Sequence, residues 1–489
     1  MAPVAQRRRG GRSVVAVLML PALVWAATAM LPSTGAAFTA STSSAAQFTA
    51  YSPYPVLTQP AETASCTGNG GSGGACSTGQ ALSGATSVVV SADGVSVHVA
   101  SMSSNALSAF SRSTATGFVT QLAGSAGCVQ HSGSWGGVCA SAVNMFETRD
   151  VAVTADGKNA YSVGVDSNAL TVLSRTTGTS GGQLTRTGCF TQVVGTSGCS
   201  DGMALLGAYG VTLSPDDKQV YVVSRSLGSV AILSRNTTTG ALAKVSCRRG
   251  VATDGDGEAC TVTAVLGGAT SLAVSPDGKN AYVAAGQPSG YGSGAVAVFS
   301  RDLTSGALTP LAGTSACVSE TGDSGTCVDG AGLWGASDVV VSPTGTSVYV
   351  TSSAGNAVAV FSRNTTTGAL TQLSGTARCI SADGSGGECT VGNALSGATA
   401  VAVTPDSTQV LVASRFSGSL AVFNRNATTG ALTQAPGTAG CYSASGAAAG
   451  CTPARALAGA SGVAVSPDGK DVYVASATSG AVTLLTRTR

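Results

Sequence analysis

Short hydrophobic runs alternate with polar turns along almost the whole chain, and the pattern repeats about every 62 residues. The clearest copy is VAVSPDGKDVYVAS at Val463–Ser476, in which two β-branched runs flank a Pro-Asp-Gly turn. Such runs, bounded by Pro, Asp and Gly, predict short strands joined by a tight turn. Related segments are Val88–Ser101, Val151–Gly164, Val211–Ser224, Leu272–Ala285, Val339–Ser352 and Val401–Ser414.

Residues 398–440 contain one complete unit, and no part of it has a helical period. The expected strands are Val401–Val403, Val410–Ala413, Leu420–Phe423 and Ala431–Gln434. Four consecutive antiparallel strands, followed by a longer loop to the next unit, predict one blade of a β-propeller. The fold class is therefore all-β.

The two ends of the chain contain complementary parts of one unit. The last unit stops at Arg489 after its third strand, whereas Val56–Gln59, followed by Cys66 and Cys76, matches the fourth strand and loop of other units. We predict a seven-bladed propeller over residues 55–489, closed when the N-terminal strand joins the three C-terminal strands. Closure would remove open sheet edges. The alternative, a linear solenoid, would need a polar cap at each end.

The N-terminus has the pattern of an export signal. Arginines at Arg7–Arg9 precede the apolar stretch Val14–Met30 and the small residues Gly35–Ala37. We expect residues 1–37 to be a signal peptide and residues 38–54 a linker. An uncleaved membrane anchor is the alternative. No later segment is long and apolar enough to span a bilayer, so we expect no membrane span after cleavage.

The cysteines agree with export to an oxidising compartment. One local pair per unit, at the same place in each unit, predicts seven disulfides that each close a loop. A zinc site would need closer Cys spacing and usually His, and the chain has only two His. The predicted pairs are Cys66 with Cys76, Cys128 with Cys139, Cys189 with Cys199, Cys247 with Cys260, Cys317 with Cys327, Cys379 with Cys389, and Cys441 with Cys451.

Charge is sparse along the chain. Charged residues make up 10% of it and the formal net charge is +2. A basic stripe able to neutralise many phosphates is absent, so nucleic acid is not an expected partner.

The unit also carries a family resemblance. The signature at Val463–Ser476, together with AVAVFSRNTTTGALTQL at Ala357–Leu373, resembles the secreted, lactonase-like and YVTN-type seven-bladed propellers. The resemblance extends over the whole predicted propeller and implies that fold. Related proteins include sugar-lactone hydrolases, muconate-type lactone enzymes and cell-surface proteins without known catalysis, so the fold alone does not select an activity.

Histidine bears on the hydrolase alternative. Lactonase-like enzymes place His with Arg and Glu in the channel, whereas neither His98 nor His131 falls on a predicted innermost strand. His98 takes a second-strand position that is Tyr in five other units, so we expect it to be a structural replacement. His131 lies in the first cysteine-closed loop.

Residues that recur in every unit are expected to be scaffold. An arginine ends the third strand of all seven units, which predicts a hydrogen-bonding device between blades. These are Arg112, Arg175, Arg235, Arg301, Arg363, Arg425 and Arg487. An aspartate recurs in the first turn of six units as a turn former. These are Asp93, Asp156, Asp216, Asp277, Asp406 and Asp468.

Residues that break the pattern are the candidates for function. Most lie where a loop enters the innermost strand, at the expected rim of the central channel, where the consensus is Gly-Ala-Thr-Ser as at Gly268–Ser271. Loops between the second and third strands open on the same face and add Asp166. The candidate ligand-binding residues are Arg149, Asp150, Tyr209, Arg225, Trp334, Asp338 and Arg415, and the candidate catalytic residues are Glu147, Arg149 and Asp150.

Two interpretations of this rim remain open. The charged groups could converge on the channel and bind a polar ligand, with an arginine holding an anion and a carboxylate orienting water. Alternatively, Arg149 pairs with Asp150 or Glu147 on a solvated rim. A weak calcium pattern at Asp254, Asp256 and Glu258 has the alternative of a solvated acidic turn, and no other cofactor is expected.

We therefore expect an extracellular, secreted or cell-surface monomer that binds an extracellular protein, a glycan or a small polar ligand. The binding surface would combine the cysteine-closed loops, expected to crowd one face, with the channel mouth. A lactone hydrolase similar to 6-phosphogluconolactonase and a structural surface or matrix protein are the alternatives. The sequence leaves open whether the protein is an enzyme.

Overall fold

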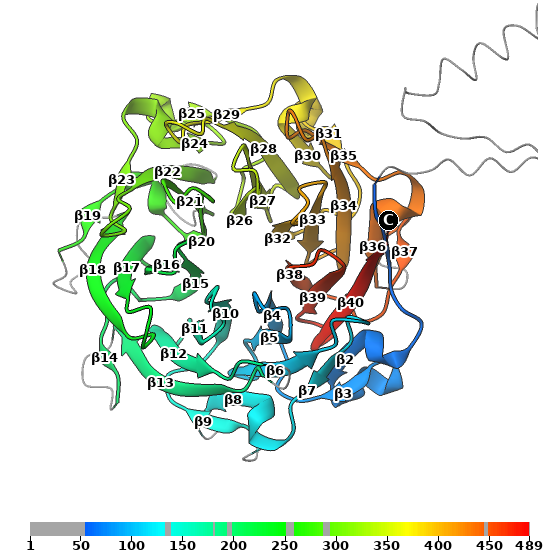
Figure 1. Ribbon diagram of the computed structural model, residues 1–489. Coiled ribbons are helices and arrows are strands. Elements are labelled where there is room, and N and C mark those ends of the chain that lie inside the picture. The colour runs from blue at the N-terminus through cyan, green and yellow to red at the C-terminus, as the bar shows by residue number, and fades with distance from the viewer. Residues whose placement is uncertain are drawn as a thin grey trace, which may run out of the picture. The chain divides into compact units, whose positions relative to one another are not determined.

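The computed structural model describes residues 54–488, except residues 133–137, 179–180, 193–197, 251–258, 287–293 and 445–447. From Val56 onward the chain forms one compact unit. Its described residues make seven sheets arranged in a ring, so the predicted seven-bladed propeller is confirmed (Figure 1). The predicted signal peptide and residues 38–53 of the predicted linker lie outside the described residues. The described part of the chain contains no helix with the length and apolarity needed to cross a membrane.

Each blade begins with three antiparallel strands, numbered outward from the ring's axis. The first strands are β4 (Ala85–Val90), β10 (Thr148–Val153), β15 (Ala208–Leu213), β20 (Ala269–Val274), β26 (Ala336–Val341), β32 (Ala398–Val403) and β38 (Ala460–Val465) of blades 1 to 7. The second strands are β5 (Ser96–Ser101), β11 (Asn159–Gly164), β16 (Gln219–Ser224), β21 (Asn280–Ala285), β27 (Ser347–Ser352), β33 (Gln409–Ser414) and β39 (Asp471–Ser476). The third strands are β6 (Ala106–Arg112), β12 (Ala169–Arg175), β17 (Ser229–Arg235), β22 (Ala295–Arg301), β28 (Ala357–Arg363), β34 (Ser419–Arg425) and β40 (Ala481–Thr488).

The fourth strand is continuous in blades 2 and 3 and split in the others. The continuous ones are β13 (Leu184–Thr191) and β18 (Leu242–Arg249). The split ones are β7 (Val119–Gln121) with β8 (Cys128–His131), β23 (Leu308–Pro310) with β24 (Cys317–Ser319), β29 (Leu370–Gln372) with β30 (Cys379–Ser381), β35 (Leu432–Gln434) with β36 (Cys441–Ser443), and β1 (Val56–Thr58) with β2 (Cys66–Asn69). Short 3₁₀ helices separate the halves: η3 (Gly124–Gly127), η6 (Gly313–Ala316), η8 (Gly375–Arg378), η10 (Gly437–Gly440) and η1 (Thr63–Ser65).

A fifth, very short strand lies at the outer edge of every blade and pairs in parallel with the fourth, which the sequence pattern did not predict. These strands are β9 (Ala140–Ala142), β14 (Ser200–Asp201), β19 (Thr261–Val262), β25 (Val328–Asp329), β31 (Thr390–Val391), β37 (Thr452–Pro453) and β3 (Ser77–Gly79). The other 3₁₀ helices in the described segments are η2 (Gly70–Gly74), η7 (Gly322–Gly325), η9 (Ser385–Gly387) and η5 (Ala264–Leu266).

All seven predicted disulfides are present, one in each blade. Each joins a cysteine of the fourth strand to the residue directly before the fifth strand, so the bridge closes the loop between these two strands. The bonded pairs are Cys66 with Cys76, Cys128 with Cys139, Cys189 with Cys199, Cys247 with Cys260, Cys317 with Cys327, Cys379 with Cys389, and Cys441 with Cys451. The pairing predicted from the sequence is therefore confirmed for every cysteine, and none is free.

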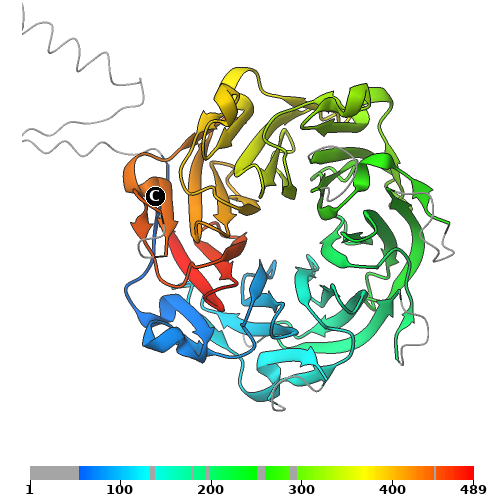
Figure 2. The ribbon, with the colours of Figure 1, turned by 180° about the vertical axis from the view of Figure 1, so that it is seen from behind.

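The two ends of the chain together form blade 7, as predicted. Strand β1 pairs antiparallel with β40, with Leu57 opposite Arg487, and β2 pairs further along the same strand. Leu57 is only 2% exposed and belongs to an apolar cluster shared by blades 6 and 7. Its carbonyl oxygen accepts a hydrogen bond from the Tyr442 hydroxyl of blade 6. Figure 2 shows the blue N-terminal segment beside the red C-terminal strands.

The core consists of apolar layers between neighbouring sheets rather than one central cluster. Every residue of the second strands is buried, because an adjacent sheet covers each face. In one such layer, Val230 and Ile232 of blade 3 pack with Leu272 and Phe299 of blade 4. The short β-branched runs of the sequence are these doubly covered strands.

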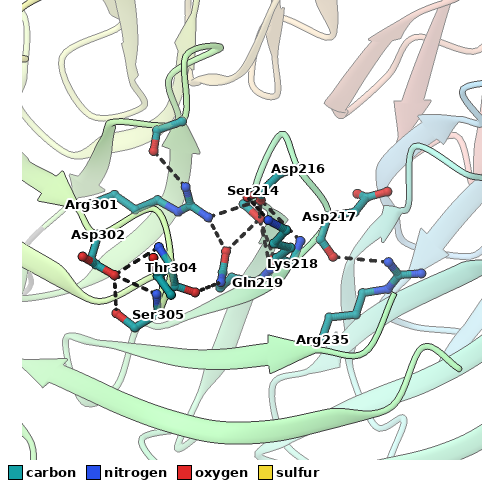
Figure 3. A network of polar contacts seen from close by, with 12 residues as sticks. Ser214, Asp216, Asp217, Lys218, Gln219, Arg235, Arg301, Asp302, Thr304 and Ser305 are labelled. Carbon is teal, nitrogen blue, oxygen red and sulfur yellow. Dashed lines mark hydrogen bonds and ion pairs between the residues drawn. The ribbon is translucent and has the colours of Figure 1, made fainter. Parts of the chain in front are cut away.

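The recurring arginine connects each blade to the preceding one, as expected. Arg301, at the end of β22, donates from Nε to the Tyr221 hydroxyl of blade 3 at 2.7 Å. Arg301 Nη2 donates to Asp216 of the same blade at 3.3 Å (Figure 3). Its Nη1 donates to the Gly278 carbonyl oxygen of its own blade at 2.9 Å. The other six arginines also donate from Nε to the preceding blade.

Three blades vary this network. In blade 6 Leu411 stands at the tyrosine position, and Arg487 Nε donates to Gln409 Oε1 at 2.8 Å instead. In blade 1 the fully buried His98 replaces the tyrosine, and its Nε2 lies 3.0 Å from Ser96 Oγ, which accepts from Arg175 Nε. His98 is thus the structural replacement that the sequence suggested. Burial, aided by the positive charge of Arg175, lowers the pKa of His98 to about 3. In blade 5 Thr344 stands at the turn-aspartate position, and Arg425 donates instead to the Thr346 and Ser347 hydroxyls.

Leu57→Ala tests the closure. We expect it to lower the free energy of unfolding by about 2–5 kcal/mol, because it leaves a cavity in a buried cluster. Val56→Ala in the same strand is the matched control; Val56 is 39% exposed, so its truncation should cost less than about 1 kcal/mol. Guanidinium unfolding with intact disulfides measures both. Equal effects of the two substitutions would contradict a role of β1 in closing the ring.

His98→Gln tests the linkage between this buried imidazole and stability. The folded pKa of His98, about 3, lies below the ordinary value of 6.5, so stability is lost as the pH falls through this window. Between about pH 7 and about pH 4.5 the native protein should lose about 2–3 kcal/mol more than the variant. Urea unfolding at both pH values measures the difference, and carboxylates and His131 cancel because both proteins contain them. Parallel pH profiles would contradict a buried neutral His98.

Candidate functional site

Each innermost strand contains a β-bulge where the chain enters the channel. In blade 3, Ala208 pairs with Ser224 and Gly210 with Val223, so the residue between them, Tyr209, has no partner in the ladder. A bulge of this kind redirects a side chain, here toward the ring's axis. The seven bulged residues are Thr86, Arg149, Tyr209, Thr270, Ser337, Thr399 and Ser461, and all of them line one cavity.

This channel-mouth cavity has a volume of about 130 Å³. Its wall is mainly hydroxyl groups and backbone, interrupted by Arg149 and Tyr209 on one side and by the carboxylates of Asp150 and Asp338. Four of the residues singled out from the sequence therefore surround one small polar space. A cavity of this size holds about four water molecules, so it can accept a few polar atoms of a larger ligand.

Two arginines flank Tyr209 at the mouth. Arg149 Nη2 donates to the Tyr209 hydroxyl at 2.6 Å, and its guanidinium carbon lies 4.4 Å from the centre of the Tyr209 ring. The guanidinium carbon of Arg225, in the loop after β16, lies 5.5 Å from the same ring. Both distances are within cation–π range. Among the described residues, neither arginine has a carboxylate within ion-pair distance, so the structure contains no Arg149–Asp150 or Arg149–Glu147 ion pair.

Asp150 bonds to both neighbouring blades. Its Oδ1 accepts from Ser87 Oγ of blade 1 at 2.6 Å and from the Val151 amide at 2.9 Å, and its Oδ2 accepts from the Val211 amide of blade 3 at 3.0 Å. Burial raises the pKa of Asp150, while these hydrogen bonds oppose the rise. Both carboxylate oxygens thus serve the cohesion of the ring.

Asp338 repeats this arrangement in blade 5. Its Oδ1 accepts from Ser271 Oγ of blade 4 at 2.6 Å, and its Oδ2 accepts from the Val401 amide of blade 6 at 2.9 Å. Burial raises the pKa of Asp338 to about 6, and the negative charge of Asp150 adds a smaller contribution in the same direction. The sequence signal for this bridging role is a serine on the neighbouring inner strand, which is Ser87 for Asp150 and Ser271 for Asp338.

Glu147 is held in an unusual backbone conformation beside Arg149. It has a φ of 52°, in the left-handed region, at the position that is glycine in the other six blades. Burial raises the pKa of the half-buried Glu147, and the nearby carboxylate of Asp166 raises it further, while Arg149 acts in the opposite direction. A non-glycine residue in this region costs about 1–2 kcal/mol, and such strain concentrates at functional sites.

Trp334 and Arg415 lie outside this cavity. Trp334 is 59% exposed just before β26, and Arg415 is exposed just after β33. Three further exposed apolar residues flank inner or second strands on the same side and were not singled out from the sequence: Phe146 at 45%, Leu206 at 41% and Phe416 at 75%. Comparison of the units within the sequence could have identified these three residues, because each stands at a position where other units have a small residue.

The cysteine-closed loops follow the fourth strand at the outer edge of each sheet, whereas the inner strands form the channel mouth (Figure 1). The first of these loops also contacts the segment that enters an inner strand. His131, at the end of β8, contacts Phe146 with ring centres 3.7 Å apart and does not line the cavity.

The candidate calcium ligands Asp254, Asp256 and Glu258 lie outside the described residues. Within the part of the chain that the structure describes, no group of three or more His, Cys, Asp and Glu side chains could hold a metal ion.

Comparison with known proteins gives a partial family match. The family model described as Lactonase, 7-bladed beta-propeller matches residues 331–441, which begin just before blade 5 and end in blade 6. A search of curated proteins found no match.

Solved structures give matches of low identity. A putative 6-phosphogluconolactonase from Bacteroides uniformis is 20% identical, covering 71% of this chain and 82% of that chain with a TM-score of 0.47. The periplasmic gluconolactonase of Pseudomonas aeruginosa is 16% identical, covering 71% and 83% with a TM-score of 0.47. Kuenenia stuttgartiensis hydrazine synthase is 16% identical, covering 83% and 96% with a TM-score of 0.48. The chain is thus similar to lactonase-like seven-bladed propellers, but the segment matched by the family model does not include Arg149, Tyr209 or Arg225.

Proposed function

We propose that this protein is an exported propeller that binds a small anionic, polyhydroxylated ligand, such as a sugar acid, at the channel mouth. One observation carries the proposal: Arg149 and Arg225, without carboxylate partners among the described residues, flank Tyr209 beside a cavity lined by hydroxyl groups. Seven disulfides and the N-terminal signal pattern support export.

The chemistry of these groups suits a carboxylate with neighbouring hydroxyls. A guanidinium presents N–H donors in a planar fork that matches the two oxygens of a carboxylate. Contact with the Tyr209 ring restricts both arginines before the ligand arrives, which lowers the entropy lost on binding. Ser and Thr hydroxyls around the cavity can donate to or accept from ligand hydroxyls.

Lactone hydrolysis is the second candidate, favoured by the partial family match and by Glu147. A lactone opens to a sugar acid, so the same arginines would bind the product. Glu147 stands two residues before Arg149 and does not itself line the cavity. It is the candidate to take a proton from water, since both oxygens of Asp150 already accept hydrogen bonds. The raised pKa of Glu147 would make it a stronger base than an ordinary glutamate.

Arg149→Gln tests ligand binding. Calorimetric titration should give measurable affinity for gluconate and none for glucose, and the substitution should weaken gluconate binding about tenfold or more, through loss of a charged hydrogen bond. Lys279→Gln, which removes an exposed positive charge from a turn on the opposite side of blade 4, is the matched control and should leave affinity unchanged. Equal affinities for gluconate and glucose would contradict the proposal.

Glu147→Gly separates the two candidates. Restoring the glycine found in the other blades should raise the free energy of unfolding by about 1 kcal/mol, because the left-handed conformation no longer carries a side chain. Glucono-δ-lactone opening, followed by proton release above the uncatalysed rate, is the matching activity measurement. Turnover by the native protein that disappears in both Glu147→Gly and Glu147→Gln would establish the hydrolase; no turnover would leave binding as the function.

A further inference from the structure

The exposed aromatic side chains gather on one face of the propeller. Of the large exposed hydrophobic residues in the described chain, three are aromatic: Phe146, Trp334 and Phe416, at 45%, 59% and 75% exposure. Phe146 and Trp334 shortly precede an inner strand, and Phe416 shortly follows a second strand, so all three lie on the side of the channel mouth. None of the three lies on the opposite face, which contains the arginine network. Exposed aromatic residues rimmed by polar groups mark binding surfaces.

Trp334 and Phe416 occupy neighbouring blades across the ring from the arginine pair. Trp334 stands three residues before Ser337, which lines the cavity in blade 5. Phe416 packs beside Gly397, the residue that leads into β32 of blade 6. Arg149 and Tyr209 belong to blades 2 and 3, on the other side of the ring's axis (Figure 1). A ligand that contacts both groups must therefore cross the mouth.

Arginine side chains lie along the same path across the mouth, from blades 2 and 3 to blades 5 and 6. Arg415, next to Phe416 in the chain, is exposed and has no ion-pair partner among the residues described. Among the described residues, guanidinium groups without an ion-pair partner thus lie at both ends of the path, with two aromatic faces near one end. The cavity between them holds only about 130 Å³, so it can take only the polar edge of a sugar ring.

We infer that the mouth face binds an acidic oligosaccharide laid across the channel, an inference that rests on the proposed function. One uronic acid contacts Arg149 and Arg225 through its carboxylate. The following sugars pack their C–H faces on Trp334 and Phe416, and a second carboxylate reaches Arg415. Aromatic faces and arginine together distinguish this ligand from a neutral glycan, which would need no guanidinium groups, and from a single sugar acid, which would not reach blades 5 and 6.

Affinity as a function of chain length tests the inference. The probes are galacturonate and its dimer, tetramer and hexamer, with cellohexaose as the neutral hexamer. Between galacturonate and the hexamer we expect Kd to fall at least about tenfold, equivalent to one or two stacked sugars. Trp334→Ala and Phe416→Ala should each remove most of this gain and leave galacturonate affinity unchanged.

Leu303→Ala is the matched control, because Leu303 is 50% exposed in a turn on the opposite face. It should change neither affinity. Equal affinity for galacturonate and the hexamer, or equal affinity for the hexamer and cellohexaose, would overturn the inference. Tighter binding of poly-glutamate than of hexagalacturonate would overturn it in favour of an acidic protein partner.

Failure of the underlying function gives a different result. If galacturonate does not bind and Arg149→Gln changes nothing for any probe, the arginine site itself is wrong. If galacturonate binds through Arg149 but longer chains gain nothing, only the inference about the oligosaccharide is wrong.

Discussion

The buried arginine at the end of each third strand is the interaction on which this ring depends. Apolar layers hold adjacent sheets together but set their relative position only loosely, because Val, Ala and Leu side chains pack in several ways. Arg301 fixes the relative position of two blades through directional hydrogen bonds. It donates to a hydroxyl and a carboxylate in the preceding blade and to a carbonyl oxygen in its own. A guanidinium that is 1% exposed requires such partners, since an unpaired buried charge is strongly destabilising.

This framework also defines which charges are available for function. Six of the seven arginines form ion pairs with the six turn aspartates on the face opposite the mouth, and Arg425 donates to hydroxyl groups instead. Asp150 and Asp338 bond to the blades on either side of their own. Charge remaining at the mouth is therefore concentrated in two carboxylates, Glu147 and Asp166, and three arginines, Arg149, Arg225 and Arg415. Only 10% of the chain is charged. The charges on one face are paired with one another, whereas those at the mouth are available for a ligand. Because the backbones of the blades are nearly identical, this difference between the two faces comes from the side chains.

The fold could be predicted largely from the sequence because its determinants are local and repeated. Period, strand runs and cysteine pairs recur in each unit, and Val56–Gln59 supplies what the last unit lacks. The fifth strand could not be predicted, because Thr390 and Val391 make a strand only through their pairing with β30 across the disulfide-closed loop. At the site, the sequence identified the residues that break the pattern but not their partners. The bond from Ser87 to Asp150 joins residues 63 positions apart and exists only when blades 1 and 2 pack against each other.

Bulges explain how a symmetric scaffold yields an asymmetric site. Every blade has the same bulge at the same place, so every blade directs one side chain toward the axis at no additional backbone cost. Five of these side chains are Ser or Thr, which leaves Arg149 and Tyr209 as neighbours in consecutive blades. At the entrance to the inner strand, blade 2 differs from the others again, because Glu147 holds the left-handed position that is glycine in the other six blades. Strain adjacent to the only bulged arginine is difficult to explain by stability, since glycine would relieve it, and this favours blades 2 and 3 as the functional side of the mouth.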